Sequence, residues 1–139
     1  MVTLTQTIPA LPARNVAAAV DHYRDRFGFA LLHHDRGFAV LGRDEAVLHL
    51  WEASDESWEE RGVGDRPVRS GAESFIAGTA SCRIRTDGID ELYEELRVSG
   101  VLHSTAGDSA SDTDYGAREV ATVDLDGNLV VFFEWGEAS

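Results

Sequence analysis

The sequence contains no lysine: its twelve basic residues are all arginine, and 25 acidic residues bring the formal net charge to −13. The excess acid lies mainly in the second half, where residues 79–139 carry thirteen acidic side chains and four arginines. Nucleic-acid binding usually requires a basic surface, so this charge argues against a nucleic-acid partner. An acidic surface would instead attract a cationic small molecule.

Cysteine and long apolar runs are also scarce. Cys82 is the single cysteine, which excludes an internal disulfide and is typical of a reducing compartment. We expect it to be a small core residue and not a nucleophile. No apolar run approaches the ~18 residues of a membrane helix, and the stretch MVTLTQTIPALPARNV lacks the basic and continuous apolar segments of a signal peptide. We therefore expect a cytoplasmic protein with no membrane partner.

What the sequence does contain is a regular series of amphipathic segments, in a chain of 139 residues that is long enough for one domain with its own core. Asn15 can cap a first helix and Gly28 can end it. In the same way, Asp87 can cap a second helix and Gly100 can end it. The apolar positions follow the helical period, at Val16, Ala19, Val20, Tyr23 and Phe27 in the first helix and at Ile89, Leu92, Tyr93 and Leu96 in the second.

Short strand-like segments surround each helix. The first contains Pro9, which inside a strand indicates an edge, a bulge or a crossing point. The polar residues 53–78 are typical of a long acidic surface loop. The expected strands are residues 2–11, 29–34, 38–42 and 46–52 before this loop, and residues 79–86, 101–104, 118–124 and 129–135 after it.

The two groups of elements repeat each other. Residues 27–29 match residues 99–101 at an offset of 72, and residues 43–52 match residues 125–134 at an offset of 82. An internal repeat of this kind determines the whole architecture. It predicts one α+β domain, residues 1–139, of two tandem strand–helix–three-strand (βαβββ) units, 1–52 and 79–139, whose sheets curve around a cleft.

Two motifs resemble the glyoxalase/bleomycin-resistance/dioxygenase superfamily, the vicinal oxygen chelate fold. They are Y-R-D-R-F-G-F at residues 23–29 and D-x-D-G-N at residues 124–128. The resemblance extends over nearly the whole chain outside the acidic loop.

Within this superfamily the sequence is most similar to the bleomycin-resistance proteins. The similarity rests on Pro9, on Phe38 after an acidic turn, on D-E-L-Y at residues 90–93 and on G-x-R-E at residues 116–119. It implies a homodimer that exchanges its N-terminal strand around the proline. It also implies that a cationic glycopeptide antibiotic is trapped at the dimer interface without chemical modification.

Metal-dependent members of the superfamily place four ligands on equivalent strands, which the repeat assigns here to Ile8, His49, Ser81 and Val131. A catalytic divalent site needs about three His, Asp, Glu or Cys ligands, and only His49 supplies one. We therefore expect no metal and no other cofactor. His49 would then either contact a ligand in the cleft or be a hydrogen-bonded core residue.

Several further residues are candidates for contact with that ligand. Aromatic side chains can stack on a flat or cationic group. Arg118 could contact the ligand or pair with Glu119, and Trp58 in the acidic loop would suit a lid or a partner contact. The full set of expected ligand-binding residues is Phe38, His49, Trp51, Phe75, Ser81, Tyr115 and Arg118.

The main hypothesis is a binding protein that sequesters a bleomycin-type antibiotic, with that small molecule and a second copy of the chain as its partners. No catalytic residue is assigned. The alternative is an enzyme of the same superfamily, a metal-dependent or metal-independent lyase, isomerase or dioxygenase. The sequence has no Ser-His-Asp arrangement, phosphate-binding loop or C-x-x-C motif that would indicate another chemistry.

Overall fold

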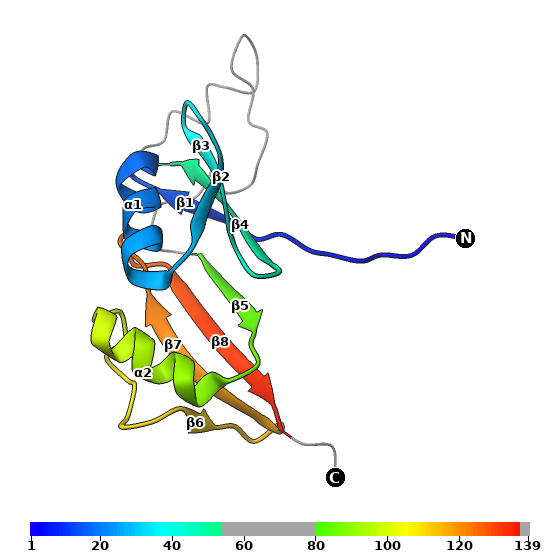
Figure 1. The fold of residues 1–139 in the computed structure, drawn as a ribbon, viewed down its shortest axis with the longest axis vertical. Helices are drawn as coiled ribbons and strands as arrows, with labels where there is room; N and C mark the ends of the chain where they lie inside the picture. The colour runs from blue at the N-terminus through cyan, green and yellow to red at the C-terminus, as the bar shows by residue number, and fades with distance from the viewer. Residues whose placement is uncertain (54–79, 137–139) are drawn as a thin grey trace.

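The computed structural model describes residues 1–53 and 80–136 as two four-stranded sheets and two helices (Figure 1). Trp58, Phe75 and almost all of the predicted acidic loop lie outside the described residues. The elements in chain order are β1 (Ala10–Ala13), α1 (Val16–Phe27), β2 (Ala30–Asp35), β3 (Phe38–Arg43), β4 (Ala46–Glu52), β5 (Ser81–Arg85), α2 (Ile89–Ser99), β6 (Ser111–Asp112), β7 (Ala117–Val123) and β8 (Leu129–Trp135).

The two sheets have the same topology. In the first, the strand order is β1-β4-β3-β2, with β1 parallel to β4 and the other neighbours antiparallel. In the second, the order β5-β8-β7-β6 repeats this arrangement, with β5 parallel to β8. The predicted α+β class and the tandem βαβββ repeat are therefore confirmed.

The first helix begins and ends where its sequence predicts. The Asn15 side chain accepts a hydrogen bond from the Ala18 N–H at 2.9 Å, and Gly28 ends the helix with a φ of 72°. That left-handed conformation favours glycine, because a Cβ atom would be strained there.

The second helix begins differently from the prediction. Its N-cap is Gly88, with a φ of 87°, so the prediction that Asp87 caps this helix is wrong. Two backbone N–H groups at the start of the helix bind a side chain of β8. The Glu134 carboxylate accepts hydrogen bonds from the N–H groups of Gly88 at 2.9 Å and of Ile89 at 3.4 Å. A cap from a strand 46 residues away leaves no local sequence signal.

Two of the strand predictions also differ from the structure. β1 starts only at Ala10, just after the Pro9 carbonyl accepts a hydrogen bond from the His49 N–H at 3.0 Å. Residues 1–8 are exposed and project away from the sheets (Figure 1). Residues 101–104 form a single bridge to β7, between Leu102 and Thr122, and the short strand β6 forms where no strand was predicted.

A continuous core runs through both units. The helices lie beside each other on one side of the sheets (Figure 1), and all the predicted apolar helix positions are buried. Phe27 of α1 stacks on Phe132 of β8, with ring centroids 6.2 Å apart. Because both helices pack on the same side, no helix within residues 1–53 and 80–136 covers the opposite face of each sheet, which we call the helix-free face.

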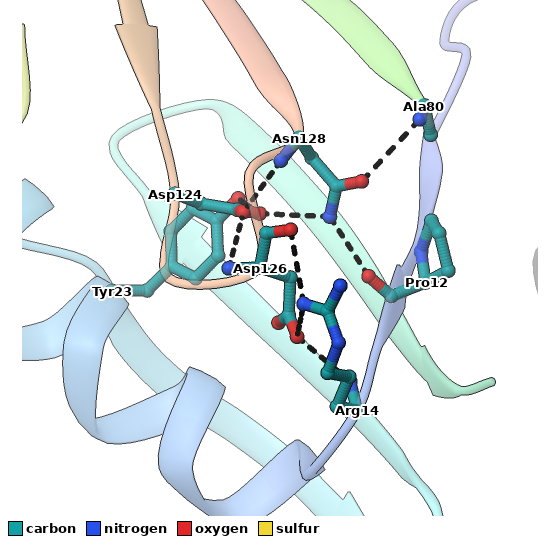
Figure 2. Close-up of polar contacts among 7 residues, drawn as sticks. All are labelled: Pro12, Arg14, Tyr23, Ala80, Asp124, Asp126 and Asn128. Atoms are coloured by element: carbon teal, nitrogen blue, oxygen red, sulfur yellow. Dashed lines mark hydrogen bonds and ion pairs between the residues drawn. The ribbon is translucent and has the colours of Figure 1, made fainter. Parts of the chain in front are cut away.

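The D-x-D-G-N turn between β7 and β8 joins the two units (Figure 2). Asp124 accepts hydrogen bonds from the N–H groups of Asp126 and Asn128, both at 2.9 Å, and from the Tyr23 hydroxyl of α1 at 2.7 Å. The Asn128 amide donates to the Pro12 carbonyl of β1 at 2.8 Å. The motif that marks the superfamily is thus a buried polar connection between the units.

Candidate ligand-binding site

Side chains on β4 alternate between the core and the helix-free face of the first sheet. Leu48 and Leu50 are buried in the core, whereas His49 and Trp51 are half-buried on the opposite face. The register of β3 places Phe38 directly across from Trp51. Strand alternation therefore gathers aromatic rings on the helix-free face.

Four side chains of the first sheet form what we call the first aromatic cluster: His33, Phe38, His49 and Trp51. The centroid of the Phe38 ring lies 4.5 Å from that of Trp51, 5.2 Å from that of His49 and 6.0 Å from that of His33. Tilted and edge-on contacts of this kind are the favoured ones for aromatic pairs. The imidazole of His49 has no hydrogen bond to any described residue, which favours ligand contact over a hydrogen-bonded core histidine.

The second sheet carries what we call the second cluster: Arg83, Tyr115, Glu119, Phe133 and Trp135. Nη2 of Arg83 donates to the Tyr115 hydroxyl at 2.8 Å and to the Glu119 carboxylate at 2.9 Å. The guanidinium carbon lies 4.9 Å from the centroid of the Phe133 ring and 5.8 Å from that of Tyr115. The hydrogen bond to Glu119 raises the pKa of Arg83, so this cluster holds a charged guanidinium beside a carboxylate.

The other predicted residues lie apart from these clusters. Ser81 is exposed at the start of β5. Arg118 points toward the helix side of the second sheet, where Nε donates to Asp90 of α2 at 2.9 Å and Nη1 donates to Asp112 of β6 at 3.1 Å. It therefore pairs within the structure, although not with Glu119, and this geometry gives no support to its predicted ligand contact.

The four positions considered for a metal do not form a set of ligands. Ile8 precedes β1, and Val131 is a buried aliphatic residue of β8. The sheet register places Ala10 across from His49 and Arg83 across from Val131. Within residues 1–53 and 80–136, no three His, Cys, Asp or Glu side chains come together as a candidate metal site.

A cavity of about 460 Å³ lies at a different place, between the β3–β4 turn and the start of α2. Its lining combines the apolar side chains of Phe29, Ile84, Leu92 and Phe132 with charged residues. Among the described residues, none of those predicted to bind the ligand lines it.

The sequence predicted Tyr115 as a ligand contact but gave no role to Arg83, which donates a hydrogen bond to it. The signal lay in strand alternation: Arg83 is two residues after Ser81 on β5 and so projects from the same face. The meeting of Arg83 with Glu119 additionally requires the order β5-β8-β7, which the repeat alone did not define.

The sequence profile of the Glyoxalase/Bleomycin resistance protein/Dioxygenase superfamily matches residues 5–132. The chain belongs to this superfamily. A bleomycin resistance protein of Geobacillus stearothermophilus is 50% identical over 131 residues, covering 94% of this chain and 97% of the relative. A bleomycin resistance protein of Klebsiella pneumoniae is 24% identical over 129 residues, covering 90% of this chain and 88% of the relative.

Solved structures show the same fold. A bleomycin-binding protein from bleomycin-producing Streptomyces verticillus, complexed with copper(II)-bleomycin, has a TM-score of 0.71 and 26% identity, covering 99% of this chain and all of that one. The predicted resemblance to bleomycin-resistance proteins is thereby confirmed. In the part of the chain that the structure describes, no helix is both long and apolar enough to span a bilayer.

Proposed function

We propose that this protein confers resistance by sequestering a bleomycin-type cationic glycopeptide without modifying it. The observation that carries the proposal is the first aromatic cluster on the helix-free face, in a chain that is 50% identical to bleomycin resistance proteins over 94% of its length. Sequestration requires a complementary surface and no catalytic group, and this surface supplies stacking without an evident acid–base pair.

The first aromatic cluster suits a flat heteroaromatic group of the ligand. Phe38 and Trp51 are half-buried, so a ring that covers them gains apolar burial together with about 0.5–1.5 kcal/mol per favourable ring contact. The net charge of −13 favours the approach of a cation from solution. We propose Phe38, His49 and Trp51 as ligand contacts, with Ser81 and Tyr115 on the second sheet.

The protein would act as a homodimer in the cytoplasm. Residues 1–8 have no hydrogen bond to any other described residue, and the apolar side chains of Val2 and Leu4 are 88% and 94% exposed. An apolar arm that leaves the sheet at Pro9 can pair with a second copy, which would also cover the helix-free faces. Sedimentation equilibrium should give the mass of two chains, and the mass of one chain would contradict the dimer.

Isothermal titration with metal-free bleomycin tests the proposed function. We expect sub-micromolar binding at one drug per chain for the wild type. Trp51→Ala and Phe38→Ala should each weaken binding by about tenfold or more, because central aromatic contacts dominate such interfaces.

Val98→Ala is the matched control, since Val98 is 76% exposed on α2, on the opposite side of the molecule from the first aromatic cluster. Its affinity should equal that of the wild type. An absence of binding at high micromolar drug would rule out bleomycin as the ligand.

A further inference from the structure

The second cluster has the composition of a cation-binding site, and that site is filled by a side chain of the protein itself. A carboxylate, a phenol hydroxyl and two aromatic rings surround the guanidinium of Arg83. Carboxylates and aromatic faces are the groups that recognise organic cations. The Tyr115 hydroxyl also donates to Glu119 at 2.9 Å, which holds the phenol and the carboxylate together without help from Arg83.

We propose that Glu119, Tyr115 and Phe133 form a subsite for a cationic group of the ligand, and that Arg83 occupies this subsite until the ligand displaces it. The inference rests on the proposed function, because it concerns how the bound antibiotic is held. The chemical class recognised is an organic cation, such as a guanidinium, an amidinium or an alkylammonium group.

The position of Arg83 allows it to leave. It lies on β5, the edge strand of the second sheet, and its side chain is 44% exposed. Exposed ion pairs and exposed cation–π contacts each change an equilibrium constant by about fivefold or less. A ligand that also binds the first aromatic cluster can therefore displace Arg83 at small cost. A small free cation lacks that second contact and would compete poorly with Arg83.

The subsite also explains how an aromatic surface can select for charge. The first aromatic cluster contains no carboxylate, so stacking there does not require a cation. Glu119 is a partly covered acid, with its side chain 27% exposed, on the helix-free face of the second sheet. A ligand that combines a flat ring with a cation would use both surfaces.

Arg83→Met removes the internal cation and retains most of the side-chain length. Titration with bleomycin should then show binding that is about threefold to tenfold tighter than for the wild type, with a steeper loss of affinity as salt is added. Adding Glu119→Gln to this variant should remove the gain. Arg85→Met is the matched control, because Arg85 lies two residues further on the same face and has no ion pair with any described residue.

The outcomes separate this inference from the proposed function. If Arg83→Met binds bleomycin more weakly than the wild type, Arg83 is itself a ligand contact. If its gain in affinity is no larger than that of Arg85→Met, the gain comes from the change in net charge alone. Either result overturns the inference.

If the wild type does not bind bleomycin, the proposed function fails but the subsite can still be tested. Benzamidine, followed by tryptophan fluorescence, should bind Arg83→Met more tightly than the wild type or the Arg83→Met/Glu119→Gln protein, and equal binding to all three would refute the subsite.

Discussion

Individual side chains in this fold have properties that depend on which face of a strand they occupy. Cys82 lies on β5 and packs against the hydrophobic core, as predicted, while its neighbours Ser81 and Arg83 are exposed. Burial, with a smaller effect of Asp124, raises the pKa of the Cys82 thiol from 9.0 to about 11. The thiolate is the reactive form, so the thiol should be inert at neutral pH.

This predicts slow alkylation of Cys82. At pH 8 the shift reduces the thiolate fraction by roughly a hundredfold, and the reaction with iodoacetamide should slow at least as much relative to the protein in denaturant. The rate should rise steadily as the pH approaches the raised pKa. Intact mass spectrometry against time measures it, and a native rate within a few-fold of the unfolded rate would contradict the burial of this thiol.

The candidate site could be predicted in part at this scale. Phe38, His49 and Trp51 were all expected to contact the ligand, and they lie on one face because strand alternation acts locally within two adjacent strands. The contact between Arg83 and Glu119 was missed because these residues are 36 apart in sequence and lie on strands that β8 separates in the sheet. Long polar side chains meet according to sheet register, which a single sequence leaves open.

Among the elements, the β7–β8 turn contributes most clearly to holding the units together. The Asn128 side chain is fully buried, and its amide bonds to Pro12 of the first unit at 2.8 Å and to Asp124 at 3.0 Å. Asn128→Ala removes the amide donor from the Pro12 carbonyl and from Asp124, whose carboxylate keeps its other hydrogen bonds, including the one from Tyr23. We expect a loss of about 2–3 kcal/mol in the free energy of unfolding, measured by urea denaturation.

Leu125→Ala provides the control in the same turn, since Leu125 is 52% exposed and should tolerate truncation with little change. Bleomycin affinity per folded molecule should stay unchanged in both variants, because the turn lies away from both clusters. A stable Asn128→Ala protein that has lost drug binding would instead make the turn part of the ligand site.

Helices were the most predictable elements, because periodicity and the Asn15 cap are local features. The start of α2 and the pairing of residues 101–104 depend instead on contacts with residues far away in the sequence. Glu134 caps α2 in place of Asp87, and residues 101–104, expected as a strand, form only one bridge to β7, while β6 pairs with that strand. Both corrections concern backbone groups whose partners lie far away in the sequence.

For the whole molecule, the internal repeat predicted the architecture, because two copies of one pattern restrict the topology far more than either copy does alone. The repeat did not predict what joins the copies. The units are joined by a shared core, by the buried turn and by contacts such as the Arg43–Glu95 ion pair, and two polar-aromatic surfaces remain on the helix-free faces. Those surfaces suit a protein that encloses its ligand.

Stoichiometric trapping without chemical change of the drug can be tested directly. The protein is incubated with a tenfold molar excess of metal-free bleomycin. Free drug is measured over many hours by ultrafiltration. The protein is then denatured to release all drug, and the molecular mass of the drug is measured by mass spectrometry. We expect free drug to fall at once by one equivalent per chain and to stay constant thereafter, and all drug to be recovered with its mass unchanged. A continuing loss of drug, or a product of altered mass, would show turnover and contradict the account in favour of an enzyme.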